Sequence, residues 1–320
     1  MQEPNTPEYR KFKNKRKLWV DCLSGDDRHS VQRQISKMLW YAAAFRVVNE
    51  ARRLAPPAKE GGVELNGTVH CLLDHGFFTS QMIAVRRLND RSGLRGKEGV
   101  YSLGGLLRDM MASADLMTRE HLLAAERLEY DYRPVRAEYD AYCREQERAG
   151  ETGYGIPEEL DWERHELRHQ VIDRLACIDR KQRAPTDSIP PEVFGRLDKK
   201  MKDACRDVHN HVNKFVAHAA SPESRVLVNA DDNRVTLGQL WTAHETISKV
   251  ANFVSIYILH GPGYGGLPIP QYDHLAHIER PLVSRDDVEK LAEEWRRYEE
   301  ETQKWASWGL DEFDAECRSK

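Results

Sequence analysis

Residues 206–218, with the sequence RDVHNHVNKFVAH, carry the strongest candidate chemistry of this chain. Histidine exchanges a proton near neutral pH, while arginine and lysine hold anions. On a helix, His211, Lys214 and His218 fall within about 60° of one line. A second line, about 100° away, is apolar and is expected to be buried; it consists of Met201, Cys205, Val208, Val212, Phe215 and Ala219. The stretch therefore predicts a titratable stripe beside a buried helix face.

A second candidate is the sequence HELRH at positions 165–169, which fits the pattern H-E-x-x-H. On a helix, His165 and His169 could share one zinc ion, with Glu166 as the general base for a bound water. Arg164 and Arg168 would lie close to the dication and repel it. The other interpretation is an exposed, charged helix face with contacts between successive turns.

A third candidate is a basic run near the start of the chain. Its members are Arg10, Lys11, Lys13, Lys15, Arg16 and Lys17. These side chains could contact phosphates, with Phe12 and Trp19 stacking on bases. Because the charges wrap around several sides of a helix, the alternative is an ordinary solvated surface.

Composition narrows the classes of function. The 320 residues include 31% charged and 40% hydrophobic residues, with a net charge of −4, so any nucleic-acid contact must be local. The six cysteines are scattered without a metal-binding or redox spacing, which favours a reducing compartment. No uncharged stretch approaches the roughly 20 residues that a membrane span needs. We expect a cytoplasmic protein without a cofactor and without a membrane partner.

Apolar residues recur at helical spacing along nearly the whole chain. This periodicity, with N-caps expected at Ser102, Thr118 and Thr236, predicts an all-α fold, an antiparallel helical bundle with additional N- and C-terminal helices. Three regions are expected: a basic N-terminal helix or arm (1–26), a bundle (27–260) with an exposed connector at about 130–156, and a Gly/Pro linker with a charged helix (261–320). The helices are expected at about 7–23, 27–55, 63–91, 103–114, 119–129, 134–149, 157–179, from 191 through the lead stretch, 236–260 and 284–308.

Parts of this pattern resemble a known family. Arg206-Asp207-x-x-x-His211 fits the R-x4–6-H signature of HEPN domains, and residues 213–218, NKFVAH, resemble the R-N-K-x-x-A-H form of abortive-infection HEPN proteins. Val212 stands at the arginine position of that second form. Upstream, RRLND (86–90) and SLGGLL (102–107) are similar to the same group's R-L-x-D and S-L-x-x-L segments. The resemblance covers roughly residues 27–260.

The resemblance implies a helical homodimer in which arginine and histidine of two chains converge and cut RNA without a metal. A histidine would take the proton of the ribose 2′-OH or protonate the leaving oxygen, and an arginine would hold the phosphate. By position, Arg206 would be the clamp and His211 the acid or base, with Lys214 and His218 as the rival pair. The residues expected to orient the histidine or contact RNA are Asp207, Asn210, Asn213 and Lys214.

Three functions follow as hypotheses. The first is a metal-independent endoribonuclease or RNA-binding protein of a prokaryotic defence or toxin–antitoxin class, with an antitoxin or defence protein as a possible partner. The second is a non-catalytic interaction module, in which the histidine-rich shoulder packs a helix pair or a dimer interface. The third is a zinc-dependent hydrolase through HELRH.

Overall fold

The computed structural model describes residues 4, 6–56, 66–216, 235–263, 266–267, 269–280 and 284–306. Over these residues the chain is all-α, as predicted, and contains no β-strand beyond one isolated bridge between Thr118 and Ser188. The α-helices are α1 (Pro7–Ser24), α2 (Val31–Leu54), α3 (Gly67–Leu88), α4 (Leu103–Met111), α5 (Arg119–Ala125), α6 (Arg133–Arg148), α7 (Trp162–Ala176), α8 (Pro191–His211), α10 (Leu237–Phe253) and α11 (Val288–Ala306). Two π-helical segments, η4 (Val212–Val216) and η6 (Val254–Ile258), continue α8 and α10, and short 3-10 turns are η1 (Ala114–Leu116), η2 (Glu158–Leu160), η3 (Arg180–Gln182) and η7 (Arg285–Asp287).

The chain divides into two compact units, Met1–Pro268 and Ile269–Lys320. The first unit holds the hydrophobic core, to which α1, α2, α3, α4, α5, α7, α8 and α10 contribute. The second unit contains α11, whose described side chains are nearly all exposed. The predicted C-terminal charged helix is therefore present, in a unit of its own.

The N-terminal helix is part of the first unit rather than an arm. On α1, Tyr9, Phe12 and Trp19 are almost completely excluded from solvent. Trp19 donates its indole N–H to Asp109 of α4 at 2.7 Å, and Lys15 binds the same carboxylate at 2.7 Å. The expected boundary at residue 26 is thus wrong, because the apolar side of α1 completes the core. Phe12 and Trp19 are consequently not available for stacking on bases.

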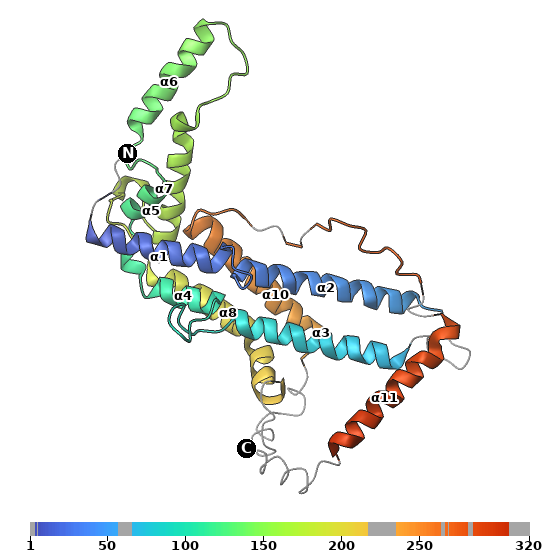
Figure 1. Cartoon of the computed structure of the whole chain (residues 1–320). Helices are drawn as coiled ribbons and strands as arrows, with labels where there is room; N and C mark the ends of the chain where they lie inside the picture. The colour runs from blue at the N-terminus through green and yellow to red at the C-terminus, as the bar shows by residue number, and fades with distance from the viewer. Residues whose placement is uncertain are drawn as a thin grey trace, which may run out of the picture. The chain divides into compact units, whose positions relative to one another are not determined.

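Within the first unit, α2, α3 and α10 lie side by side (Figure 1), and α8 packs against α4, α10 and α3. The sequence signals for helix starts are confirmed at three positions. Ser102 accepts a hydrogen bond from the backbone N–H of Gly105, Thr118 from that of His121, and Thr236 forms a capping box with Gln239. These caps define where α4, α5 and α10 begin, and α4 and α10 both pack against α8.

The predicted exposed connector helix is α6, which contains no buried residue and packs against α7. The face of α7 that carries HELRH is buried, so the expected exposed charged face is wrong. His165, Glu166, Arg168 and His169 are each less than 10% exposed. Burial of four polar side chains within five positions requires partners within the fold.

Candidate functional site

The lead stretch occupies the end of α8 and the start of the π-helical segment η4. Pro191 opens α8 at its first turn, and the helix runs without interruption to His211. Met201, Cys205, Val208 and Val212 are fully buried, as the apolar line predicted. A π-helical turn is rare in proteins and is frequently found at functional sites. The end of α8 therefore combines a fixed buried face with an altered backbone beside it.

Two of the predicted residues lie on the open side of α8. Arg206 is exposed and forms an ion pair with Asp203, one turn earlier. Asp207 accepts a hydrogen bond from the side chain of Gln239 at 2.9 Å, which links α8 to the first turn of α10. Asn210 is exposed. Arg206 and His211 are five positions apart on a regular helix, about 140° around its axis, so one chain does not bring them together.

His211 lies on the other side, half-buried, with its ring centroid 4.9 Å from that of Phe215. Its Nδ1 atom is buried and has no hydrogen-bond partner among the described residues. Burial lowers the pKa of His211 below its usual value. Asn213 and Lys214 are half-buried on η4, whereas His218 lies outside the described residues. His211 is therefore a largely neutral imidazole near pH 7, able to accept a proton.

His209 is a residue that the motif comparison missed. It is half-buried, and its Nδ1 also lacks a partner among the described residues. Its pKa is lowered by burial and then by the charges of Arg86 and Arg91, while Asp90 acts in the opposite direction. These three charged residues lie at and just beyond the end of α3. The sequence signal was present, since His209 belongs to the same stretch, but neither candidate pair, Arg206 with His211 or Lys214 with His218, includes His209.

The segments RRLND and SLGGLL, twelve or more residues apart in sequence, meet in the structure. Ser102 donates its hydroxyl to the backbone oxygen of Asp90 at 2.8 Å. A Cβ atom placed on Gly104 would lie 2.5 Å from that same oxygen, so only glycine allows this approach. The Asp90 carboxylate accepts a hydrogen bond from the backbone N–H of Ser92 at 2.7 Å. The C-terminal end of α3, the start of α4 and His209 of α8 thus form one neighbourhood.

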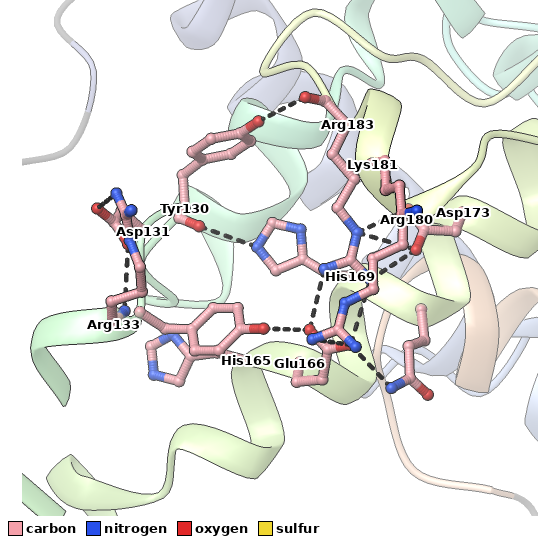
Figure 2. Close-up of polar contacts among 12 residues, drawn as sticks. Tyr130, Asp131, Arg133, His165, Glu166, His169, Asp173, Arg180, Lys181 and Arg183 are labelled. Carbon is pink, nitrogen blue, oxygen red and sulfur yellow. Dashed lines mark hydrogen bonds and ion pairs between the residues drawn. The ribbon is translucent and has the colours of Figure 1, made fainter. Parts of the chain in front are cut away.

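The HELRH residues belong to a separate polar network (Figure 2). His169 Nε2 lies 3.1 Å from the backbone oxygen of Tyr130, and its Nδ1 lies 3.0 Å from Nη1 of Arg119. Because arginine only donates, Nδ1 accepts and Nε2 carries the proton. His165 Nδ1 accepts from the backbone N–H of Glu129 at 2.9 Å. Both histidines therefore use ring nitrogens to bind the chain itself.

The Glu166 carboxylate is also bound by side chains of the fold. It accepts hydrogen bonds from Tyr132, from Arg183 at 2.9 Å and from Gln170 at 2.9 Å. Burial raises the pKa of Glu166, but these hydrogen bonds outweigh burial and lower the pKa to about 2. Burial, followed by the charge of Arg119, lowers the pKa of His169 to about 4. At neutral pH the glutamate is charged and the histidine is neutral, as a fixed polar network requires.

The described part of the chain contains no group of three or more histidine, cysteine or acidic side chains arranged to hold a metal ion. Glu166 and His169 are instead engaged by arginines and by backbone groups. Arg168 is fully buried, pairs with Glu126 at 2.8 Å and donates to the backbone oxygens of Tyr257 and Ile258 at 2.6 and 3.0 Å. It satisfies carbonyl groups at the end of η6 that would otherwise lack partners. These contacts support a packing role for the HELRH face.

Comparisons with known proteins do not place the chain in a family. No protein-family model matches it, and neither the curated proteins nor the solved structures contain a match. Within the described residues, no helix combines the length and apolar character needed to cross a membrane. The class that the fold itself defines is an all-α protein with a buried ionic network and a histidine-bearing helix end.

Proposed function

We propose that the chain is a HEPN-like protein that binds RNA and cleaves it without a metal, using the end of α8. The observation that carries this proposal is the meeting of three sequence segments. RRLND and SLGGLL are joined through Ser102 and Asp90, and both lie beside the histidine-bearing face of α8. The three segments that resemble the family are therefore neighbours in space, which supports a shared role.

The chemistry follows from the state of the histidines. Burial lowers the pKa values of His209 and His211, so both rings are largely neutral near pH 7, and a neutral imidazole can act as a general base. The proton would come from a ribose 2′-OH, whose oxygen attacks the adjacent phosphorus while the bond to the 5′-oxygen breaks. A protonated histidine donates a proton to that leaving oxygen. Arg86, Arg206 or Lys214 would stabilise the charge that develops on the phosphate.

The position of Arg206 makes a homodimer part of the proposal. Its side chain diverges from His211 by about 140° around α8, so the pair can act together only when a second chain supplies one member. Mixing inactive Arg206→Ala with inactive His211→Ala should then restore part of the activity, because some mixed dimers hold one intact pair. Equal inactivity of the mixture would argue for a site within one chain.

Purified protein tests the activity directly. Single-stranded RNA should be cleaved, with cleavage unchanged by EDTA. His211→Ala or His209→Gln should reduce the rate at least 100-fold, since a positioned acid or base contributes about 10²–10⁴-fold. His218→Ala tests the rival pair of Lys214 and His218. His75→Ala is the matched control, because His75 is exposed on the far part of α3. Full cleavage by all three site variants would overturn the proposal.

A biological setting in prokaryotic defence or a toxin–antitoxin pair, in the cytoplasm, belongs to the same proposal. The support is the family resemblance of residues 86–107 and 206–218. Expression in bacteria should then be toxic, and the toxicity should disappear in the double variant His209→Gln, His211→Ala. Equal toxicity of the double variant would separate any defence role from RNA cleavage.

A non-catalytic interaction module is the second candidate, favoured by a different observation. The described part of α11 exposes apolar side chains at a spacing that places them on one face: Val288, Leu291, Trp295 and Tyr298. Exposed apolar faces of this kind are typical of protein contacts. This candidate predicts a stable oligomer without nuclease activity, and Leu291→Glu with Trp295→Glu should reduce the mass measured by light scattering.

A further inference from the structure

A groove in the first unit lies between α2, α3 and the segment 99–101. Its volume is about 1260 Å³, larger than the roughly 300–1,000 Å³ of an ordinary small-molecule pocket. The groove is separate from the HELRH network and takes Arg87 from α3, whereas the neighbouring Arg86 acts on His209. Its lining includes basic and aromatic side chains, of which only Arg87 belongs to a motif of the sequence analysis.

The groove is lined mainly by positively charged side chains. Arg28, Arg33, Lys37 and Arg87 line it together with a single carboxylate, Asp27. All four cations are exposed, and none has an ion pair with another residue in the part of the chain that the structure describes. Unpaired cations around a concave surface concentrate anions there. The groove is therefore suited to a ligand with several negative charges.

The side chain of Gln34 links two walls of the groove. Gln34 on α2 donates its amide to the backbone oxygen of His29 at 2.7 Å and to that of Tyr101 at 2.9 Å. It thereby ties the turn before α2 to the segment that forms the opposite wall. A preformed wall reduces the ordering cost that a ligand would otherwise have to overcome.

Aromatic and polar groups accompany the charges. Arg33, Lys37 and Tyr41 follow one another at one-turn intervals on α2 and span about 12 Å. Tyr41 is 45% exposed, with the Lys37 ammonium 5.7 Å from its ring centroid. Gln81 also lines the groove, is only 1% exposed, and its Oε1 has no hydrogen-bond partner among the described residues. A buried amide oxygen without a partner favours a ligand that donates a hydrogen bond to it.

We propose that this groove binds a phosphorylated nucleoside, with the phosphates against Arg33, Lys37 and Arg87 and the base on Tyr41. Stacking on an aromatic ring accepts any base, while cations hold the phosphates. The amide oxygen of Gln81 then accepts a hydrogen bond from the base or sugar. Free nucleoside triphosphates and short single-stranded RNA share this chemistry. The site is independent of the proposed cleavage by the α8 histidines.

Binding to the full-length protein, measured by calorimetry at low salt, tests the proposal. The probes are ATP, inorganic tripolyphosphate and a six-nucleotide single-stranded RNA. We expect ATP or the RNA to bind more tightly than tripolyphosphate, and the tighter of the two identifies the source of the ligand. Arg33→Glu with Lys37→Glu should weaken binding by about 10- to 100-fold, because two charge-assisted contacts are lost.

Two controls make the result specific. Arg144→Glu with Arg148→Glu changes the charge by the same amount at exposed positions of α6 and should leave binding within about twofold. Tyr41→Ala should weaken ATP or RNA binding but not tripolyphosphate binding. The proposal is overturned if no probe binds, if both double variants weaken binding equally, or if Tyr41→Ala has no effect. The His209→Gln, His211→Ala protein should still bind the probes even though it should no longer cleave RNA. Failure of the nuclease proposal and failure of this proposal therefore give different results.

Discussion

The guanidinium of Arg119 on α5 is completely excluded from solvent and bridges Asp173 and Asp187 at 2.7 and 2.9 Å. Its Nη1 also faces His169 of the HELRH sequence. Asp173 in turn pairs with Arg183 at 2.6 Å, and Arg183 with Glu166. Charges from α5, α7 and the segment before α8 are therefore neutralised in one buried network, and the network requires every member because a buried charge without a partner is costly.

Removal of Arg119 tests this dependence. Arg119→Ala should lower the free energy of unfolding by about 3–5 kcal/mol, since it leaves Asp187 and part of Asp173 uncompensated. Urea unfolding followed by circular dichroism measures the change. Arg133→Ala is the matched control: Arg133 is 86% exposed and pairs with Asp131 at the surface, so its loss should change the free energy of unfolding far less. Similar losses in the two variants would show that burial of the network contributes little.

Because of His244 on α10, the free energy of unfolding should decrease at acid pH. His244 is 3% exposed, neither ring nitrogen has a partner among the described residues, and burial lowers its pKa from 6.5 to about 4. Between these values the unfolded chain binds a proton that the folded protein does not. The contribution of His244 to the free energy of unfolding is therefore fully present above about pH 6.5 and decreases as the pH falls towards 4. Between pH 7.5 and 5 the decrease is about 2 kcal/mol.

His244→Phe should remove that share of the pH dependence while changing the stability at pH 7.5 by no more than about 1.5 kcal/mol, because the ring is replaced by an apolar one. Unfolding free energies at pH 7.5 and 5 provide the measurement. His75→Phe, at an exposed position of α3, should keep the pH dependence of the original protein. An unchanged pH dependence in His244→Phe would mean that His244 is protonated equally in both states.

Two glycines provide a matched pair of substitutions. A Cβ on Gly104 would lie 2.5 Å from the backbone oxygen of Asp90 and 2.9 Å from that of Asn89, whereas nothing lies within 4 Å of a Cβ on Gly195 in α8. Gly104→Ala should destabilise the protein by about 1–3 kcal/mol through backbone displacement. Gly195→Ala should stabilise it by about 0.5–1 kcal/mol, as expected in an open helix position. Thermal unfolding of both variants measures the contrast, and equal melting temperatures would show that α4 does not approach Asp90 as described.

Trp19 tests whether α1 belongs to the core. Its side chain is fully buried, so Trp19→Ala should cost about 3–5 kcal/mol. Trp295→Ala on α11, where the ring is 70% exposed, should change the stability little. Circular dichroism during heating compares the two variants. If α1 were a separate arm, Trp19→Ala would leave the melting temperature of the first unit unchanged.

Local patterns predicted the secondary structure well, because helix periodicity and capping act over only a few residues. The caps at Ser102, Thr118 and Thr236, the exposed helix now seen as α6, and the buried line of α8 all follow from such short-range signals. The burial of α1 was less visible, since its apolar residues are separated by many lysines and arginines whose long side chains reach solvent from the edge of a buried face.

The amino-acid sequence by itself determined an all-α chain and pointed to the end of α8 as the place where titratable side chains gather. Tertiary structure decided what those side chains face. It separated Arg206 from His211 around the helix, brought His209 beside Arg86 and Asp90, and enclosed HELRH in a network of arginines. Sequence spacing specifies an angle around one helix axis, whereas charge partners and burial depend on which other helices pack there.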